Sequence, residues 1–305
     1  MDILGAVGKT PLFELKSFGI PERGVRIFAK GEFLNVSGSV KDRAARAMIA
    51  DGIERGIFTK DKTLIDSTSG NTGIAYAAIA AALGYRVKLY MPANVTVERQ
   101  KYMKALGAEL ILTDAMEGID GAYGAVLDEV KRAPEKYFFP DQYTNDCNWK
   151  AHYSGTAAEI IEQTDGKVTH FVAGTGTSGT FMGCTRRLKE YSPYIKCYNM
   201  TPDSPFHGIE GVKHCTCLTH SGFFDESISD GQIEVTTETA YDTARLLARN
   251  EGLFVGISAG ANAAAAQKLA GTVPDGSVIV TILCDSGCRY LSGRLWGDGN
   301  AADKR

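Results

Sequence analysis

Two short segments rich in small residues are the most informative part of this chain. The first reads Asn-Val-Ser-Gly-Ser-Val-Lys-Asp-Arg over residues 35–43, and the second reads Ser-Thr-Ser-Gly-Asn-Thr-Gly over residues 67–73. The first brings Lys41 to an expected helix start through a tight turn. The second joins an expected strand to an expected helix, where unsatisfied backbone N–H groups bind anions. Together they predict a reactive amine that faces an anion-binding loop.

Apolar runs alternate with segments of helical periodicity along the chain, which predicts an α/β fold with mostly parallel, doubly wound sheets. One series has strands near 25–29, 63–65, 87–91 and 110–112 and helices near 43–53, 72–83, 97–106 and 121–132. A second series has strands near 170–173, 195–198 and 278–282 and helices near 149–162, 180–190, 238–250 and 259–269. We therefore expect two α/β lobes that share a cleft.

The composition favours small-molecule chemistry. The chain has 305 residues, enough for two ordinary domains, and its formal net charge of -3 offers no basic surface for nucleic acid. No stretch reaches the roughly 18 apolar residues that a membrane helix needs, and the first residues do not resemble a secretion signal. We expect a cytoplasmic protein.

The cysteines point to reduced thiols rather than to a disulfide framework. Their number is seven, and their spacing is irregular. His214, Cys215, Cys217 and His220 place four soft ligands within seven residues, but structural zinc usually takes two spaced pairs. We expect no metal there, and we interpret residues 202–230 as an irregular loop beside the cleft.

A third glycine segment covers residues 174–180 and also joins a strand to a helix. It matches the G-x-G-x-x-G pattern of dinucleotide-binding folds, and Asp203 falls near the end of the next strand, as a ribose-binding acid would. Threonine and serine at four of the seven positions favour one compact phosphate instead. This segment alone leaves a nicotinamide-dependent reductase open.

Two further turns of small residues, at 256–261 and 284–287, follow late in the chain. Ligands of doubly wound sheets bind beyond the carboxyl ends of the strands. We therefore expect the glycine-rich loops and the late turns to gather around one ligand.

This set of segments, in this order, resembles the fold type II pyridoxal-phosphate enzymes, specifically the cysteine synthase (O-acylserine sulfhydrylase) and cystathionine β-synthase branch. The resemblance runs from Val-Gly-Lys-Thr-Pro-Leu at 7–12 to Asp-Ser-Gly-Cys-Arg-Tyr-Leu-Ser at 285–292. It implies a smaller lobe over 36–145, a larger lobe formed by 1–35 and 146–305, and pyridoxal 5'-phosphate in the cleft between them.

The resemblance also implies roles for particular residues. Lys41 would hold the cofactor covalently and act as the catalytic acid–base, and Asn71 would contact the ring hydroxyl. Ser286 would meet the pyridine nitrogen. The cofactor phosphate would lie against Gly176, Thr177, Ser178, Gly179 and Thr180, and the substrate carboxylate against Thr68, Ser69, Thr72 and Gln142.

A serine at the pyridine nitrogen favours elimination, because a neutral hydroxyl makes the ring a weaker electron sink than an aspartate would. The implied reaction is β-replacement on O-acetylserine or O-phosphoserine. Lys41 removes the Cα proton, the leaving group departs to give an α-aminoacrylate, and sulfide or another sulfur donor adds to give L-cysteine.

The chain departs from the family pattern at two places. Residues 209–214 read Ile-Glu-Gly-Val-Lys-His where the family usually has Ile-Gln-Gly-Ile-Gly. Lys213 would suit a phosphate leaving group, or else point to solvent. Ser178 replaces a usual glycine, which is tolerated if its φ angle is negative.

Several alternatives stay open at this point. Within the family they are synthesis of cystathionine or diaminopropionate, and deamination of serine or threonine. Outside it, they are the reductase and a non-catalytic binding paralogue. The resemblance further implies a homodimer, and leaves a sulfur-carrier protein or a serine acetyltransferase open as a partner.

Overall fold

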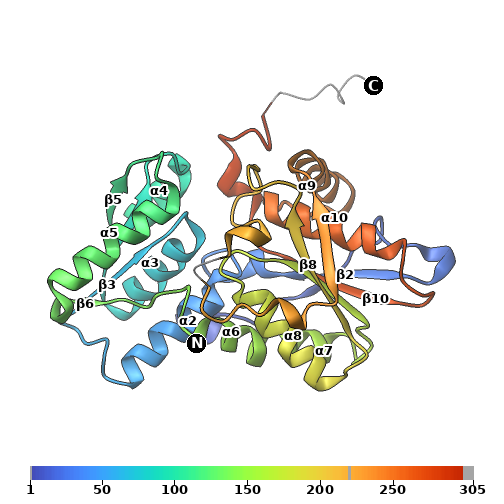
Figure 1. Ribbon diagram of the computed structural model, residues 1–305, viewed down its shortest axis with the longest axis horizontal. Coiled ribbons are helices and arrows are strands. Elements are labelled where there is room, and N and C mark those ends of the chain that lie inside the picture. The colour runs from blue at the N-terminus through green and yellow to red at the C-terminus, as the bar shows by residue number, and fades with distance from the viewer. Residues whose placement is uncertain (1, 219–220, 298–305) are drawn as a thin grey trace.

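The chain folds into two α/β lobes, each built on its own sheet (Figure 1). The computed structural model describes residues 2–218 and 221–297. Within these residues, no helix is long and apolar enough to cross a membrane. The two-lobed α/β architecture expected from the sequence is confirmed.

The large lobe contains a six-stranded sheet in the order β1-β2-β10-β7-β8-β9. All neighbours in it are parallel except β1 and β2. The strands are β1 (Leu12–Glu14), β2 (Arg26–Gly31), β7 (His170–Gly174), β8 (Lys196–Pro202), β9 (Gly231–Val235) and β10 (Val278–Leu283).

Helices cover both faces of the large sheet, which is why its inner strands are continuous apolar runs. Val172 and Ile279 pack with α9 (Thr237–Glu251) and α10 (Ile257–Ala270), whereas Phe171 and Val280 pack with α7 (Ala157–Gln163) and α8 (Gly179–Tyr191). The remaining elements that precede β3 or follow β6 are short. They are α6 (Cys147–Ala151), the 3₁₀ turns Pro21–Arg23, Glu32–Leu34, Cys215–Cys217, Glu226–Ile228 and Gly287–Tyr290, and α1 (Ile3–Ala6), whose Leu4 packs against the core of the small lobe.

The small lobe contains a four-stranded parallel sheet in the order β5-β4-β3-β6. Its strands are β3 (Thr63–Ser67), β4 (Arg86–Pro92), β5 (Glu109–Thr113) and β6 (Tyr137–Phe138), and a 3₁₀ turn (Pro134–Lys136) precedes β6. One face packs on α2 (Lys41–Glu54), α3 (Asn71–Leu83) and α4 (Val97–Ala105), and the other on α5 (Gly118–Arg132).

The strands and helices expected from periodicity are all present, but the sequence carries no signal for β1, β6 and β9. All three lie at sheet edges, where burial imposes no long apolar run, and β1 and β6 are only three and two residues long. The helix expected over 149–162 is interrupted by a π-helical turn, His152–Thr156. Single π turns inside helices often occur at functional sites.

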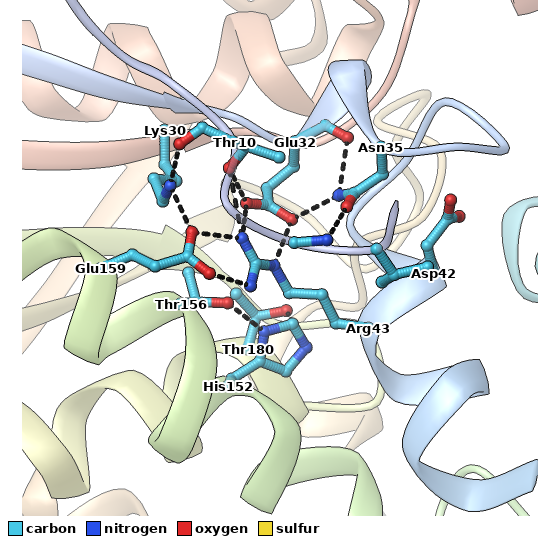
Figure 2. Close-up of polar contacts among 12 residues, drawn as sticks. Thr10, Lys30, Glu32, Asn35, Asp42, Arg43, His152, Thr156, Glu159 and Thr180 are labelled. Carbon is cyan, nitrogen blue, oxygen red and sulfur yellow. Dashed lines mark hydrogen bonds and ion pairs between the residues drawn. The ribbon is translucent and has the colours of Figure 1, made fainter. Parts of the chain in front are cut away.

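A buried cluster of charges ties the N-terminal end of α2 to the large lobe (Figure 2). The Arg43 guanidinium donates to Glu32 at 2.7 and 2.9 Å and to Glu159 at 2.7 and 2.8 Å. Lys30, fully buried on β2, forms an ion pair with Glu159 at 2.6 Å. Although burial alone would raise it, the charges and hydrogen bonds of Arg43 and Lys30 hold the pKa of Glu159 at about 2. These buried charges are thus paired, as buried charges must be.

The cluster predicts acid sensitivity. Glu159 titrates at about 2 in the folded protein against 4.5 in an unfolded chain, so its contribution to stability is complete above pH 4.5 and is lost as the pH falls toward 2. We expect Glu159→Gln to be less stable at neutral pH and to lose less stability on acidification than the wild type. Urea midpoints measured between pH 7 and pH 3 check this.

The matched control is Glu162→Gln, which removes an exposed carboxyl group from the same helix. A Glu159→Gln variant with the full wild-type dependence on pH would contradict the assignment of this acid sensitivity to Glu159.

Candidate functional site

A cavity of ≈ 260 Å³ lies where the loops at the carboxyl ends of both sheets meet. Loops that follow β3, β7, β8 and β10 contribute to its lining. Among the described residues that line it, Lys41, Arg99 and Lys213 are basic and none is an aspartate or a glutamate. The cavity is therefore suited to an anionic ligand.

Lys41 is the first residue of α2 and lines the cavity. The turn before it is held by the end of β10, because Val40 N–H donates to the Cys284 carbonyl at 2.8 Å and Ser39 forms a β-bridge with Asp285. Burial lowers the pKa of the Lys41 amine, and the Asp285 carboxylate opposes this shift. A buried amine of lowered pKa is a candidate nucleophile and general base.

The loop between β3 and α3 is pre-organised by its own hydroxyls. Thr68 Oγ1 accepts from the backbone N–H groups of Gly70 at 2.9 Å and Gly73 at 3.2 Å. Thr72 Oγ1 donates to Gln142 Oε1 at 2.8 Å, and Gln142 Nε2 donates to the Ser67 carbonyl at 3.0 Å. Thr68, Ser69, Thr72 and Gln142, the four residues expected to bind a carboxylate, all line the cavity.

The loop between β7 and α8 brings Gly176, Thr177, Ser178, Gly179 and Thr180 to the cavity. A Cβ atom at Gly176 would overlap the Gly211 carbonyl oxygen, so only glycine fits there. Thr177 Oγ1 accepts from Asn148 Nδ2 at 3.0 Å. Because these residues surround the N-terminus of a thirteen-residue helix, their N–H groups form an anion site.

Ser178 does not have the negative φ angle at which a serine would be tolerated without strain. Its φ is 70°, in the left-handed region, where a residue with a side chain is strained. The Ser178 hydroxyl lies 2.8 Å from that of Ser221, and Ser221 Oγ also donates to the Thr177 carbonyl at 3.1 Å. The chain thus keeps a glycine-like backbone at this position and fixes it with hydroxyl contacts.

A residue of the π-helical turn contacts the side chain of Thr180 (Figure 2). His152, buried in that turn, places Nδ1 2.9 Å from Thr156 Oγ1 and Nε2 3.3 Å from Thr180 Oγ1. Burial, together with the charges of Arg43 and Lys41, lowers the pKa of His152 well below 6.5. A neutral imidazole therefore contacts the Thr180 hydroxyl.

The structure does not bring Ser286 to the cavity. Its hydroxyl accepts from Cys288 N–H at 3.3 Å and caps the 3₁₀ turn Gly287–Tyr290, and Ser286 lines a separate groove with Arg289. The hydroxyl that lines the cavity near the end of β10 is that of Ser258, at the start of α10, beside Cys284. Burial raises the pKa of Cys284 to about 12, so its thiol is neutral.

The turn at 256–261 faces the cavity, as the sequence predicts, whereas the resemblance implied that Ser286, in the turn at 284–287, meets the ring nitrogen. Three further lining residues were not singled out from the sequence: Arg99 and Tyr143 lie in no motif, and Tyr290 lies in the segment 285–292 but had no role assigned to it.

Two ion pairs cross the rim of the cavity from residues 209–214 to the small lobe. Glu210 Oε2 accepts from Arg99 Nη1 at 2.5 Å. Lys213 Nζ lies 3.7 Å from Asp120 Oδ1 and 5.1 Å from the centre of the Tyr143 ring. Lys213 lines the cavity and is largely buried, so it does not point to solvent.

Two other sequence expectations concern residues away from this cavity. Asp203 is exposed and does not line it, so the arrangement for a dinucleotide ribose is not formed. His214 caps the 3₁₀ turn Cys215–Cys217, and His220 lies outside the described residues. Within the described residues, no group of three or more acidic, histidine or cysteine side chains could hold a metal ion.

Comparisons with known proteins agree with this geometry. The family described as "Pyridoxal-phosphate dependent enzyme" matches residues 3–285. The cysteine synthase of Aquifex aeolicus is 50% identical over 302 residues, 97% of this chain and 92% of the relative. Cysteine synthase B of Escherichia coli is 41% identical over 292 residues, 96% of this chain and 95% of the relative. The crystal structure of cysteine synthase from Entamoeba histolytica superimposes with a TM-score of 0.91 at 38% identity, covering 97% of this chain and 90% of that one.

Proposed function

The chain belongs to the family of pyridoxal-phosphate-dependent enzymes, and we propose that it acts as a cysteine synthase. The reaction replaces the β-substituent of an O-activated serine with a sulfur nucleophile. The observation that carries this proposal is the buried amine of Lys41, in one cavity with a carboxylate loop and a helix N-terminus. Family membership also decides against a nicotinamide-dependent reductase.

The residues present fit pyridoxal phosphate. The backbone around Gly176 leaves no space for a side chain, and the N-terminus of α8 supplies N–H donors for a phosphate. Thr177 and Thr180 add hydroxyls, and Lys41 supplies the amine that would bind the aldehyde. We assign the contact with the ring nitrogen to Ser258, because Ser286 does not line the cavity.

When bound, pyridoxal phosphate supplies an electron-withdrawing ring that makes the Cα proton of an attached amino acid acidic. Burial lowers the pKa of Lys41, so that its amine can take up and return this proton. The loop 68–72 and Gln142 would bind the substrate carboxylate and fix Cα beside Lys41. The hydroxyl of Ser258 and the thiol of Cys284 keep this part of the cavity neutral, which favours loss of a β-substituent over transamination.

We propose that the leaving group is phosphate, so that the substrate is O-phosphoserine in preference to O-acetylserine. The proposal is based on Lys213. Its ammonium lines the cavity and lies 3.7 Å from the carboxylate of Asp120, whose side chain is 65% exposed. A phosphate dianion offers Lys213 a stronger interaction than this rim carboxylate does.

The cytoplasm is the proposed location, since all seven cysteines are free thiols.

We also propose a homodimer. Val36 and Tyr102 are both more than two-fifths exposed, and together with Phe33 they line a surface groove of ≈ 360 Å³. Grouped exposed apolar side chains are typical of protein interfaces. Analytical ultracentrifugation should give twice the chain mass of 32.8 kDa, and a monomer at micromolar concentration would contradict the proposal.

Lys41 should be the residue that binds the cofactor. Borohydride reduction of the loaded protein should fix the cofactor to the peptide that contains Lys41, as read by mass spectrometry, and Lys41→Ala should lose both the label and the activity. Lys30 is the internal control, because it is also buried but is paired with Glu159. A label on another lysine would refute the assignment.

Lys213→Ala should discriminate between the two activated serines. We expect kcat/KM for O-phosphoserine to fall about tenfold to a hundredfold, because a charge-assisted contact contributes roughly 1.5–3 kcal/mol. The value for O-acetylserine should change little.

Asp120→Ala should have the opposite effect and increase phosphoserine turnover, because it removes the carboxylate that competes for Lys213. Equal losses with both substrates in Lys213→Ala would show that Lys213 does not bind the leaving group.

A further inference from the structure

Asp285 is a fully buried carboxylate that does not line the cavity but stands directly behind it. Its Oδ2 accepts from Asn71 Nδ2 at 2.8 Å and from the Tyr290 hydroxyl at 2.8 Å. Its Oδ1 has no hydrogen-bond partner among the described residues. A Cβ atom at Gly256 would overlap this oxygen, so the packing leaves space only for the carboxylate. Nothing in the reaction described above uses Asp285.

The two contacts of Asn71 fix the orientation of its side-chain amide. Its Oδ1 accepts from Arg289 Nη1, while its Nδ2 donates to Asp285. If the amide were reversed, its N–H groups would face a guanidinium and its oxygen would face a carboxylate. A primary amide carries two N–H groups, and Asp285 takes one of them. The other remains for the cavity, which Asn71 lines.

Asp285 and Arg289 also bind the segment that precedes Lys41. The Asp285 backbone forms a β-bridge with Ser39, and Arg289 Nη2 donates to the Ser37 carbonyl. Arg289 is 5% exposed. The turn 285–289 thus touches both the lysine segment and the amide of Asn71, two groups that lie thirty residues apart in the sequence.

We propose that Asp285 is a positioning residue that holds the Asn71 amide with one N–H directed at the bound cofactor or substrate. The carboxylate acts through Asn71, and Arg289 fixes the other end of the same amide. This inference rests on the proposed cofactor role of the cavity.

A double-mutant cycle tests the proposal. Asn71→Ala and Asp285→Leu are made singly and together, and the affinity of the cofactor-free protein for pyridoxal phosphate is measured by fluorescence titration. Each single variant should weaken binding about fivefold to tenfold, the effect of one hydrogen bond. The double variant should bind pyridoxal phosphate no more weakly than the single variant with the lower affinity, because both substitutions remove the same contact. The visible band of the bound cofactor should move by the same amount in all three.

Conservative and control variants separate positioning from a structural role. Asp285→Asn keeps an acceptor oxygen for Asn71 and should bind the cofactor within about twofold of the wild type. Asp66→Asn removes another buried carboxylate, bonded to Tyr76 in the small lobe at 3.0 Å, and should leave the visible band unchanged. If Asp285→Leu shows no cooperative thermal transition, Asp285→Ser replaces it in the cycle, because serine is too short to reach Asn71.

Losses that multiply in the double variant, or an Asp285→Leu variant with wild-type affinity and spectrum, would overturn the proposal. A wild-type protein that takes up no pyridoxal phosphate would instead contradict the proposed function itself. The two failures are therefore distinguishable.

Discussion

The rest of the site depends on the hydrogen bond from Val40 N–H to the Cys284 carbonyl, which joins the lysine-bearing turn to the last strand of the large sheet. An amine whose pKa is lowered by burial has little solvent to stabilise its charge, so its position must be set by the protein backbone. The bridge between Ser39 and Asp285 adds a second fixed point. Lys41 is held by residues about 240 positions later in the chain.

Buried ion pairs also fix the segment that follows Lys41. Arg43, two residues after Lys41, is bound by carboxylates of Glu32 and Glu159 from two other elements. His152, next to this cluster, contacts the hydroxyl of Thr180 at the phosphate loop. The charges of Arg43 and Lys41 also act on His152, because they help to keep its imidazole neutral beside the phosphate loop.

Patterns of neighbouring residues were sufficient to predict most of the strands and helices and the two loops at 67–73 and 174–180. Long apolar runs and helical periods report on burial, and glycine-rich turns at strand ends report on ligand loops. The sequence could not show which late serine lines the cavity, because both turns reach it, one through Ser258 and the other through Cys284. The edge strands β1 and β9 were missed for the reason that little of their surface is buried. The condition set for Ser178, a negative φ angle, is not met, and its hydroxyl contacts that of Ser221, which is distant in sequence.

Helix α2 belongs to both lobes at once. Its first turn is tied by Arg43 to Glu32 and Glu159 of the large lobe (Figure 2). Further along the helix, Ala45, Met48 and Ile49 pack in the core of the small lobe. A rotation of the small sheet relative to the large one would thus have to leave the first turn of α2 in place, as long as the ion pairs of Arg43 hold. Lys41 belongs to that first turn and would stay with the large lobe.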